Sequence, residues 1–560
     1  MSASKIWLNS YPKGVPATIE VEDVVSIGDL FEKACAKYGD LPAFECMGTS
    51  TSFKELEADS RAFGAALLAQ GLRKGDRVAL MMPNLLQYPV ALFGILRAGL
   101  VAVNVNPLYT PRELEHQLAD SGAKALVIVE NFAKTFEEVA GHFPGILVVT
   151  TAIGDMMPAP KRWVVNFVTK NVKKMVPEFN LPGAKGFRDV LYAGRSASWA
   201  PHPTTLSDVA FLQYTGGTTG VAKGAMLSHG NIAHNLRQSG AWISGSFVEG
   251  EEVAVSPLPL YHIFCLTSML SFMTWGAKNI LIPNPRDMKG FSKLLGSTRW
   301  TIITGVNTLF NGLVNAEGFK GADFSSVKVC VGGGAPVQSA VAKAWKTIVG
   351  VGITEAYGLT ETSPGVSINP IGAEFNGSIG LPLPSTDISI RSEGFEDLGT
   401  WDGSSGKEKF TGEICVRGPQ VMIGYWQKPD ETAKVMREGW FQTGDVGHMD
   451  RAGFVYLTDR KKDMILVSGF NVYPNEIEDA LASCPGLLEA AAVGVPDEKS
   501  GEAVKIFVVK KDPALTKEDV IAHCKTKLTG YKLPRHVEFR DSLPKSPIGK
   551  ILRRELRDKK

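Results

Sequence analysis

Residues 60–81 read SRAFGAALLAQGLRKGDRVALM, and this stretch decides the fold of the chain. Within 60–70 the apolar residues recur at helical spacing, and Gly71 ends the pattern. Residues 73–81 then pass through a charged turn into a continuous apolar segment, which indicates a buried strand. The stretch therefore predicts a helix followed by a strand, the repeating order of layered α/β proteins.

The same order returns at other places in the chain. The paired helical and strand-like segments are 89–97 with 100–105, 114–120 with 123–129, and 289–295 with 300–305. Repeated alternation of this kind indicates α/β layers. A length of 560 residues corresponds to roughly three or four domain-sized units. We therefore predict a large N-terminal α/β region of several subdomains over residues 1–458.

Composition excludes several classes of protein. Hydrophobic residues make up 44% of the chain, and the net charge of +2 gives no strong field for nucleic acid or another polyanion. The seven cysteines are scattered and form no CxxC pair, so they indicate neither a disulfide framework nor a zinc site and favour a reducing, cytoplasmic location. The N-terminal residues lack a signal-peptide pattern, and the apolar stretch 88–103 is shorter than the ~20 residues of a membrane span.

A second, smaller domain is predicted near the C-terminus. Residues 459–463 (DRKKD) form a charged connector between two apolar segments, and we predict a hinge there. The following residues, 464–560, suit one α+β domain by length. Its expected strands are 490–495 and 505–510, and Thr516, with an acid three residues on, resembles a capping box for a helix to about residue 528.

Residues 161–176 (KRWVVNFVTKNVKKMV) stand apart from the rest of the chain. On a helix, Trp163 and Phe167 share a side with Met175, and the segment carries five cations and no acid. Two interpretations remain open. The segment is either an interfacial helix on the anionic cytoplasmic face of the inner membrane or a surface helix with solvated lysines.

A glycine-rich segment at 214–224, YTGGTTGVAKG, indicates a phosphate site. It follows an apolar strand-like run, its backbone amides can surround phosphate oxygens, and Lys223 adds a positive charge. The ordinary P-loop pattern fails because Ala222 precedes the lysine and Gly224 follows it. A glycine-rich turn without a ligand is the plain structural alternative.

Three further motifs carry polar groups suited to a nucleotide. EAYGLTETS (355–363) follows the glycine-rich VGGGAP (331–336) and offers an aromatic ring for a purine, threonines for phosphate and a carboxylate for Mg²⁺. WFQTGD (440–445) ends in an aspartate that can accept ribose hydroxyls. PKSPIGKILRR (544–554) places a lysine after a glycine near the end of the chain. Taken singly, each has an ordinary structural alternative: a glycine-rich turn, a turn aspartate or a solvated basic tail.

The set and order of these motifs resemble the adenylate-forming superfamily of acyl-CoA synthetases, luciferases and peptide-synthetase adenylation domains. The resemblance covers roughly residues 30–555 and runs through YTGGTTGVAKG, PLPLYHIF (257–264), YGLTETSP (357–364), GEICVRGPQVMIGYW (412–426), GWFQTGD, DRKKDMILVSG (459–469) and GKILRR (549–554). The region from GWFQTGD onward looks most like bacterial long-chain fatty acid–CoA ligases of the fatty-acid degradation type.

The resemblance implies a reaction in two steps. A fatty acid and ATP give an acyl adenylate and pyrophosphate, and coenzyme A then displaces AMP to give a thioester. Mg²⁺ is the implied cofactor, and ATP and coenzyme A are co-substrates. The alternatives are a medium-chain or aryl acid–CoA ligase, an acyl-AMP ligase serving a carrier protein, and a lipid-binding or uptake protein with a vestigial site. Because the chain ends ten residues after Lys550 without an appended carrier domain, free coenzyme A is the favoured acceptor.

The family roles transfer to this sequence motif by motif. The expected ATP-binding residues are Thr215, Gly216, Gly217, Thr218, Thr219, Gly220, Lys223, Gly334, Ala335, Ala356, Tyr357, Gly358, Asp445, Arg460 and Lys462. The expected catalytic residues are Lys550, Thr360, Glu361 and His262, and the expected metal ligands are Glu361 and Thr215. Ser468 and Gly469 would serve the thioester step. Because they share the small domain with Lys550, the resemblance implies that this domain rotates about the hinge between the two steps.

The sequence departs from the family pattern at three positions. Gly216 stands where many members have serine or threonine, and Ala222 where proline is common. We expect activity to survive both changes. Leu266 occupies the position of a gating tryptophan in some long-chain members, so the family's gate does not transfer to this chain.

Overall fold

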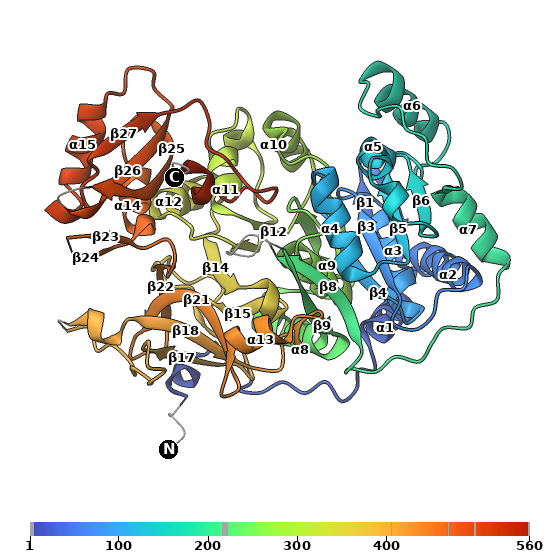
Figure 1. The fold of residues 1–560 in the computed structure, drawn as a ribbon, viewed down its shortest axis with the longest axis horizontal. Coiled ribbons are helices and arrows are strands. Elements are labelled where there is room, and N and C mark those ends of the chain that lie inside the picture. The colour runs from blue at the N-terminus through green and yellow to red at the C-terminus, as the bar shows by residue number, and fades with distance from the viewer. Residues whose placement is uncertain (1–4, 216–221, 405, 469, 498–499, 558–560) are drawn as a thin grey trace.

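The computed structural model describes residues 5–215, 222–404, 406–468, 470–497 and 500–557. It confirms a large N-terminal α/β region with a smaller α+β domain at the C-terminus, which Figure 1 shows in red and orange beside the rest of the molecule. The segments predicted from alternation are all present. For example, helix α2 (Phe53–Ala69) precedes strand β3 (Arg77–Met81), as the sequence at 60–81 predicts.

The first sheet contains the strands predicted from the N-terminal alternation. In the described part of the chain it has eight strands in the order β19-β9-β8-β4-β3-β5-β6-β7, with β3 to β8 parallel. The strands after β3 are β4 (Val101–Asn104), β5 (Ala125–Val129), β6 (Leu147–Thr151), β7 (Lys185–Gly186), β8 (Val209–Thr215), β9 (Lys223–Ser228) and β19 (Gly424–Tyr425).

A second sheet lies beside the first. Nine strands are described in the order β16-β15-β14-β13-β12-β10-β11-β1-β2, and β10 to β14 are parallel. Its strands are β1 (Pro42–Cys46), β2 (Thr49–Ser52), β10 (Val253–Ser256), β11 (Lys278–Leu281), β12 (Ile302–Gly305), β13 (Val329–Gly332), β14 (Ile353–Gly358), β15 (Gly365–Ile368) and β16 (Leu381–Pro382).

Two smaller sheets complete the described fold. The first consists of β17 (Asp387–Arg391), β18 (Gly412–Arg417), β20 (Met436–Arg437), β21 (Trp440–Met449) and β22 (Val455–Arg460). The sheet of the C-terminal domain consists of β23 (Ile465–Val467), β24 (Phe470–Val472), β25 (Leu487–Asp497), β26 (Gly501–Lys510) and β27 (His536–Phe539). A separate core of buried side chains, including Val472, Ile477 and Ile506, lies within this last domain.

Helices cover these sheets, and their bounds follow local signals. The larger N-terminal helices are α1 (Ile27–Tyr38), α3 (Gln87–Arg97), α4 (Pro111–Ser121), α7 (Phe187–Ser196), α8 (His229–Ile243), α9 (Ile263–Thr274), α10 (Met288–Ser297), α11 (Asn307–Val314) and α12 (Ser339–Val349). The remaining helices are α5 (Ala133–Glu137), α6 (Lys161–Phe167), α13 (Pro429–Val435), α14 (Pro474–Ala482), α15 (Lys517–Lys525) and α16 (Arg553–Leu556).

Capping and close packing explain where these helices begin and how they cross. Ser52 and Glu55 form a capping box at the start of α2, which satisfies amide groups that have no partner within the helix. Helices α2 and α3 approach closely at glycines, since a Cβ on Gly64 would lie 2.7 Å from the carbonyl oxygen of Gly94. The predicted capping box at Thr516 is confirmed, although α15 ends at Lys525 and not near residue 528.

The segment 161–176 departs from the single helix that the sequence predicts. Helix α6 ends at Phe167 and is followed by one π-helical turn, Val168–Val172. After this turn the chain is no longer helical. Figure 1 shows α6 projecting at the edge of the molecule, away from the central sheets. Among the described ranges, none of the helices combines the length and the apolar character needed to cross a bilayer.

Candidate active site

A cavity of about 750 Å³ lies where the N-terminal sheets meet residues 460–462 and the C-terminal tail. Its walls include residues of strands β8, β9, β13, β14, β15, β21 and β22 and of helices α8, α9 and α13. The tail that follows β27 adds Ile548 and Lys550. Residues more than three hundred positions apart in the sequence therefore face one space.

Most of the predicted site residues that the structure describes line this cavity. They are Thr215, Lys223, His262, Gly334, Ala356, Tyr357, Gly358, Thr360, Glu361, Asp445, Arg460, Lys462 and Lys550. Ala335 is not among the lining residues, and Ser468 lies exposed in the turn between β23 and β24. The predicted phosphate-loop residues Gly216, Gly217, Thr218, Thr219 and Gly220, and the predicted thioester-step residue Gly469, lie outside the described residues.

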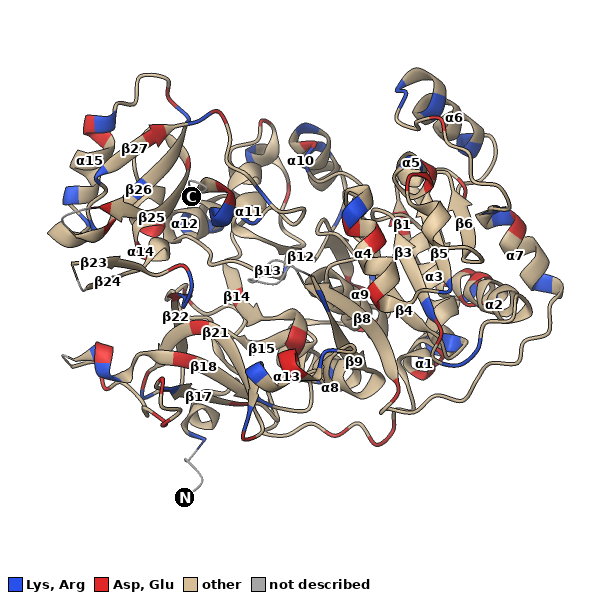
Figure 2. Cartoon of the chain, viewed as in Figure 1, with Lys and Arg blue, Asp and Glu red and all other residues tan. Residues whose placement is uncertain are grey.

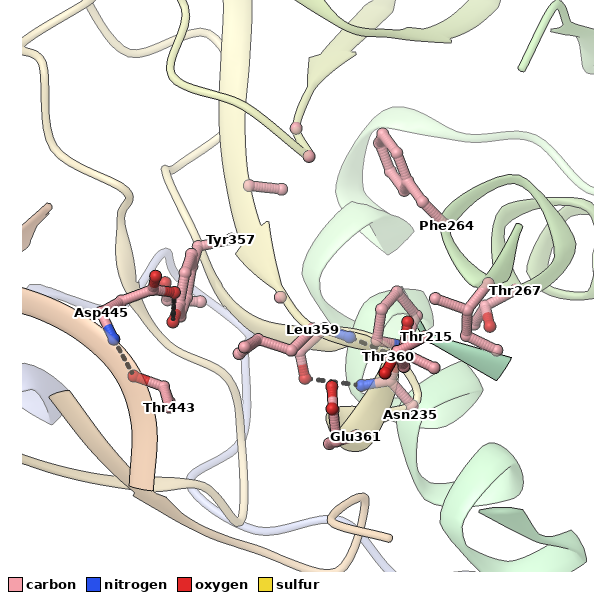
Figure 3. Close-up of a pocket in the computed structure, with 18 of the residues that line it drawn as sticks. Thr215, Asn235, Phe264, Thr267, Tyr357, Leu359, Thr360, Glu361, Thr443 and Asp445 are labelled. Carbon is pink, nitrogen blue, oxygen red and sulfur yellow. Dashed lines mark hydrogen bonds between the residues drawn. The ribbon is translucent and has the colours of Figure 1, made fainter. Parts of the chain in front are cut away.

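The predicted ribose aspartate is held by two neighbours. The hydroxyl of Tyr357 donates a hydrogen bond of 2.7 Å to Oδ2 of Asp445, and Figure 3 shows the two side chains pointing toward each other. Arg460 is the cross-strand partner of Asp445 on β22, and its Nε lies 3.3 Å from Oδ1. The tyrosine therefore orients the carboxylate, and the guanidinium keeps a positive charge beside it.

The predicted metal carboxylate, Glu361, lies in the short helical turn after β14. Tyr425 of β19 donates a hydrogen bond of 2.7 Å to its Oε1, and the backbone amide of Met422 donates to its carbonyl oxygen at 2.7 Å. Burial raises the pKa of Glu361, and the bond from Tyr425 opposes this shift. Figure 3 places Glu361 near Thr360 and Thr215, the two threonines predicted to contact phosphate and metal.

Lys550 reaches the cavity from a tight turn at residues 546–550. The amide of Lys550 donates to the hydroxyl of Ser546, and the amide of Ser546 donates to the carbonyl of Lys550. Thr308 on α11 fixes this turn to the N-terminal region by donating a hydrogen bond of 2.9 Å to the carbonyl of Gly549. Gly549 has a φ of +86°, and a Cβ there would lie 2.7 Å from the hydroxyl oxygen of Thr308, so the contact requires glycine.

Burial depresses the basicity of two groups in this part of the cavity. It lowers the pKa of Lys550 to about 8, and the positive Arg460 acts in the same direction. Burial likewise lowers the pKa of His262 to about 4, with a smaller effect from Lys550. His262 begins α9 and accepts the amide hydrogen of Phe264 at its Nδ1. At neutral pH the pair therefore consists of a neutral imidazole and a mostly charged amine.

One side of the cavity is less polar and is lined by α8, α9 and neighbouring strands. The apolar residues that line it are Ile243, Ile263, Phe264, Phe272, Val331, Ile368 and Leu383. Ser239, Ser268 and Ser271 add hydroxyl groups to the same helices. Leu266, at the position of the family's gating tryptophan, is fully buried and does not line the cavity. The apolar part of the cavity therefore lies next to the polar groups carried by the strands.

The structure adds several residues that the sequence reasoning did not single out. Tyr425 contacts Glu361, while Glu431 on α13 forms an ion pair with Lys223 and Lys434 lines the cavity. Tyr425 lies within the motif GEICVRGPQVMIGYW, but the motif alone does not indicate a role for this residue. Glu431 and Lys434 carry no local sequence signal, because an exposed helix with mixed charges is common on any protein surface.

Two family profiles match the chain. Residues 31–426 match the AMP-binding enzyme family, and residues 476–550 match the AMP-binding enzyme C-terminal domain. A long-chain-fatty-acid–CoA ligase of Escherichia coli O157:H7 is 55% identical over 558 residues, which cover 99% of this chain and 98% of that protein. A long-chain-fatty-acid–CoA ligase of Bacillus subtilis strain 168 is 36% identical, again over 99% of this chain and 98% of that protein.

Solved structures of similar proteins share the fold. ATP-bound MatB from Rhodopseudomonas palustris superposes with a TM-score of 0.80 at 28% identity, covering 95% of this chain and 98% of that one. An anthranilate CoA ligase in complex with anthranoyl-AMP superposes with a TM-score of 0.84 at 23% identity, covering 96% of this chain and 98% of that one.

Proposed function

The chain belongs to the AMP-binding enzyme family, and within that family we propose that it acts as a long-chain fatty acid–CoA ligase. The observation that carries the proposal is the match to long-chain-fatty-acid–CoA ligases, 55% identical over 99% of the chain. The reaction converts a fatty acid, ATP and coenzyme A into an acyl thioester, AMP and pyrophosphate. The product would enter fatty-acid degradation by β-oxidation.

The cavity supports this chemistry through the placement of its charged groups. Asp445, oriented by Tyr357, is suited to accept the ribose hydroxyls, while Thr360 and Lys223 would bind phosphate oxygens. Lys550 would stabilise negative charge that develops on the fatty-acid carboxylate and the α-phosphate as the adenylate forms. His262, neutral at physiological pH, borders the acyl carboxylate without adding charge. The acyl chain would lie against the apolar residues that α8 and α9 contribute to the cavity.

The donor set also fits Mg²⁺ bound to a nucleotide. Mg²⁺ prefers oxygen ligands and binds nucleotide sites through one or two carboxylates together with substrate phosphates. Glu361 supplies such a carboxylate with Oε1 already held by Tyr425, and Thr215 supplies a hydroxyl on the same wall. The ion would neutralise charge on the phosphates.

Pyrophosphate release tests the proposed function directly. The purified protein is assayed with ATP, Mg²⁺ and a panel of straight-chain acids from butyrate to stearate, with benzoate and anthranilate as aryl acids. Long-chain acids should give the highest kcat/KM, and adding coenzyme A should yield the thioester. An equal or higher kcat/KM for aryl or short acids would contradict the long-chain assignment, and adenylate without thioester would favour an acyl-AMP ligase.

The metal assignment predicts that Glu361→Ala lowers the rate of adenylation and weakens its Mg²⁺ dependence. Metal neutralisation of phosphate charge contributes several kcal/mol to such transition states, so a loss of about 10²-fold or more is expected. The measurement is palmitate-dependent pyrophosphate release against Mg²⁺ concentration. Tyr425→Phe serves as a control, since it removes only the hydrogen bond to Glu361. An unchanged Mg²⁺ titration in Glu361→Ala would contradict the assignment.

We further propose that the segment 161–176 contacts a membrane surface. Its large apolar side chains are exposed to solvent: Trp163 is 63% exposed, Phe167 61% and Met175 50%. Figure 2 shows basic positions along α6, and the segment contains no acid. A helix with exposed aromatic groups and only positive charge suits the interface of an anionic bilayer. Fatty acids partition into such bilayers, so this contact would bring the protein close to its substrate.

Replacing Lys170, Lys173 and Lys174 with Gln should reduce binding to anionic vesicles. Each lysine near an anionic surface contributes ~1 kcal/mol, so the triple variant is expected to lose about two orders of magnitude in partitioning at low salt. The measurement is co-sedimentation with vesicles that contain phosphatidylglycerol. The matched control replaces Lys517, Lys525 and Lys527, which are exposed on or beside α15, with Gln. Equal losses in both variants would contradict a specific role for this segment.

A further inference from the structure

Lys223, the lysine that is expected to bind phosphate, is already paired with a carboxylate. Glu431, on α13, forms an ion pair through its Oε2 with Nζ of Lys223, and through its Oε1 with Nζ of Lys434. Lys223 and Lys434 both line the cavity. One carboxylate therefore bridges two cations at the edge of the space in which the nucleotide would lie.

Lys223 lies beside Tyr425 in the wall of the cavity. Its Nζ lies 5.3 Å from the centre of the Tyr425 ring, and the hydroxyl of the same tyrosine bonds to Glu361. The side chain of Lys223 is 17% exposed, and that of Glu431 is 28% exposed. Glu431 therefore places an anion directly beside a largely buried amine.

Glu431 stays ionised at any pH at which the protein would work. The ion pairs with Lys223 and Lys434 lower the pKa of Glu431 to about 2. The side chain of Lys434 is more exposed than that of Lys223, at 68% against 17%. Figure 2 shows positions of both signs on this helix. Loss of the carboxylate contact would therefore free two positive charges together.

We propose that Glu431 is an internal competitor for the phosphate site and that Lys434 is a second cation for the β- and γ-phosphates of ATP and for pyrophosphate. A bound polyphosphate chain displaces Glu431 from both lysines. When pyrophosphate leaves, Glu431 returns to them, which weakens rebinding of the product. This inference rests on the proposed function and adds to it a residue that tunes the affinity for polyphosphate.

The test compares ligands with and without the outer phosphates. Dissociation constants of the full-length protein are measured by calorimetry for pyrophosphate, for α,β-methylene ATP and for AMP, each with Mg²⁺ and without fatty acid. Glu431→Gln should bind pyrophosphate and the ATP analogue about fivefold more tightly, the effect of a partly exposed ion pair. Lys434→Gln should bind both about fivefold more weakly. AMP binding should be unchanged in both variants, since AMP lacks the outer phosphates.

Asp430→Asn is the matched control, because it removes the same charge from the adjacent exposed position of α13. Equal tightening in Asp430→Asn and Glu431→Gln, or equal tightening for AMP and pyrophosphate, would overturn the proposal. So would unchanged pyrophosphate affinity in Lys434→Gln, a measurement that does not depend on the folding of the Glu431 variant. Failure of the proposed function itself is recognised separately, as the absence of palmitate-dependent pyrophosphate release by the unmodified protein.

Discussion

Lys550→Ala is expected to lose adenylation by about 10²- to 10³-fold, the usual effect of removing one group that stabilises charge in a transition state. The half-reaction from supplied palmitoyl adenylate and coenzyme A to the thioester should continue at a near-normal rate. The reason is that Lys550 lines the cavity in the present domain orientation, whereas Ser468, expected to serve the second step, lies exposed and outside it. Single-turnover assays of the two half-reactions provide the measurement.

The pH dependence of adenylation gives an independent test of Lys550. Because the folded pKa of this lysine is about 8, its positive charge is present below that value and is lost as the pH rises through it. The kcat/KM for adenylation should therefore fall above about pH 8, because the pH dependence of kcat/KM reports the pKa values of groups in the free enzyme. Lys550→Arg stays charged and should remove this alkaline fall while keeping part of the rate. Equal loss of both half-reactions in a folded Lys550→Ala protein would contradict a role confined to adenylation.

A disulfide between residues 339 and 479 is expected to block thioester formation while sparing adenylation. Ser339 begins α12 of the N-terminal region, and both its amide and its hydroxyl donate to Oδ1 of Asp479 on α14 of the C-terminal domain at 3.0 Å. Cysteines at these two positions would hold the domains in the present orientation. Displacing reacting groups by even ~1 Å lowers a reaction rate about 10²-fold. The rate of thioester formation by the oxidised protein should therefore fall by at least that factor.

The controls for this cross-link are the reduced double variant and each single cysteine. All seven natural cysteines are buried, so oxidation should join the introduced pair selectively. Reduction with dithiothreitol should restore thioester formation, and both single variants should remain active in both steps. An oxidised, cross-linked protein that forms the thioester at the reduced rate would show that no domain rotation about residues 459–463 is needed, and the hinge proposal would be withdrawn.

Much of the fold and of the site could be predicted from sequence. The pattern at 60–81 predicts α2 and β3 because helices and strands place apolar residues at different spacings, and this spacing is a local property. The motifs likewise predict Thr360, Glu361 and Asp445 as site residues, and all three line one cavity. The family resemblance, and not the spacing, assigned their roles.

The bounds of the helix within 161–176 could not be predicted from the local sequence pattern. Spacing indicates an amphipathic helix, but the chain changes to a π-helical turn after Phe167. Hydrogen bonds from Gly154 and to Asp155 hold the side chain of Asn166 just before that change. Periodicity does not report these contacts, because the partners lie in a separate loop. The exposure of Trp163 and Phe167 likewise became known only from the structure.

The sequence by itself determined the order of helices and strands, the residues that could bind a nucleotide and the family to which they point. Tertiary structure alone decided the contacts of these residues. Tyr357 donates a hydrogen bond to Asp445, and Tyr425 donates one to Glu361. Glu431 forms an ion pair with Lys223. The partners in the last pair are 208 positions apart. Local spacing reflects the geometry of a single helix or strand, whereas such contacts depend on how sheets, loops and the C-terminal tail pack in space. The charge and orientation of each site residue follow from those contacts.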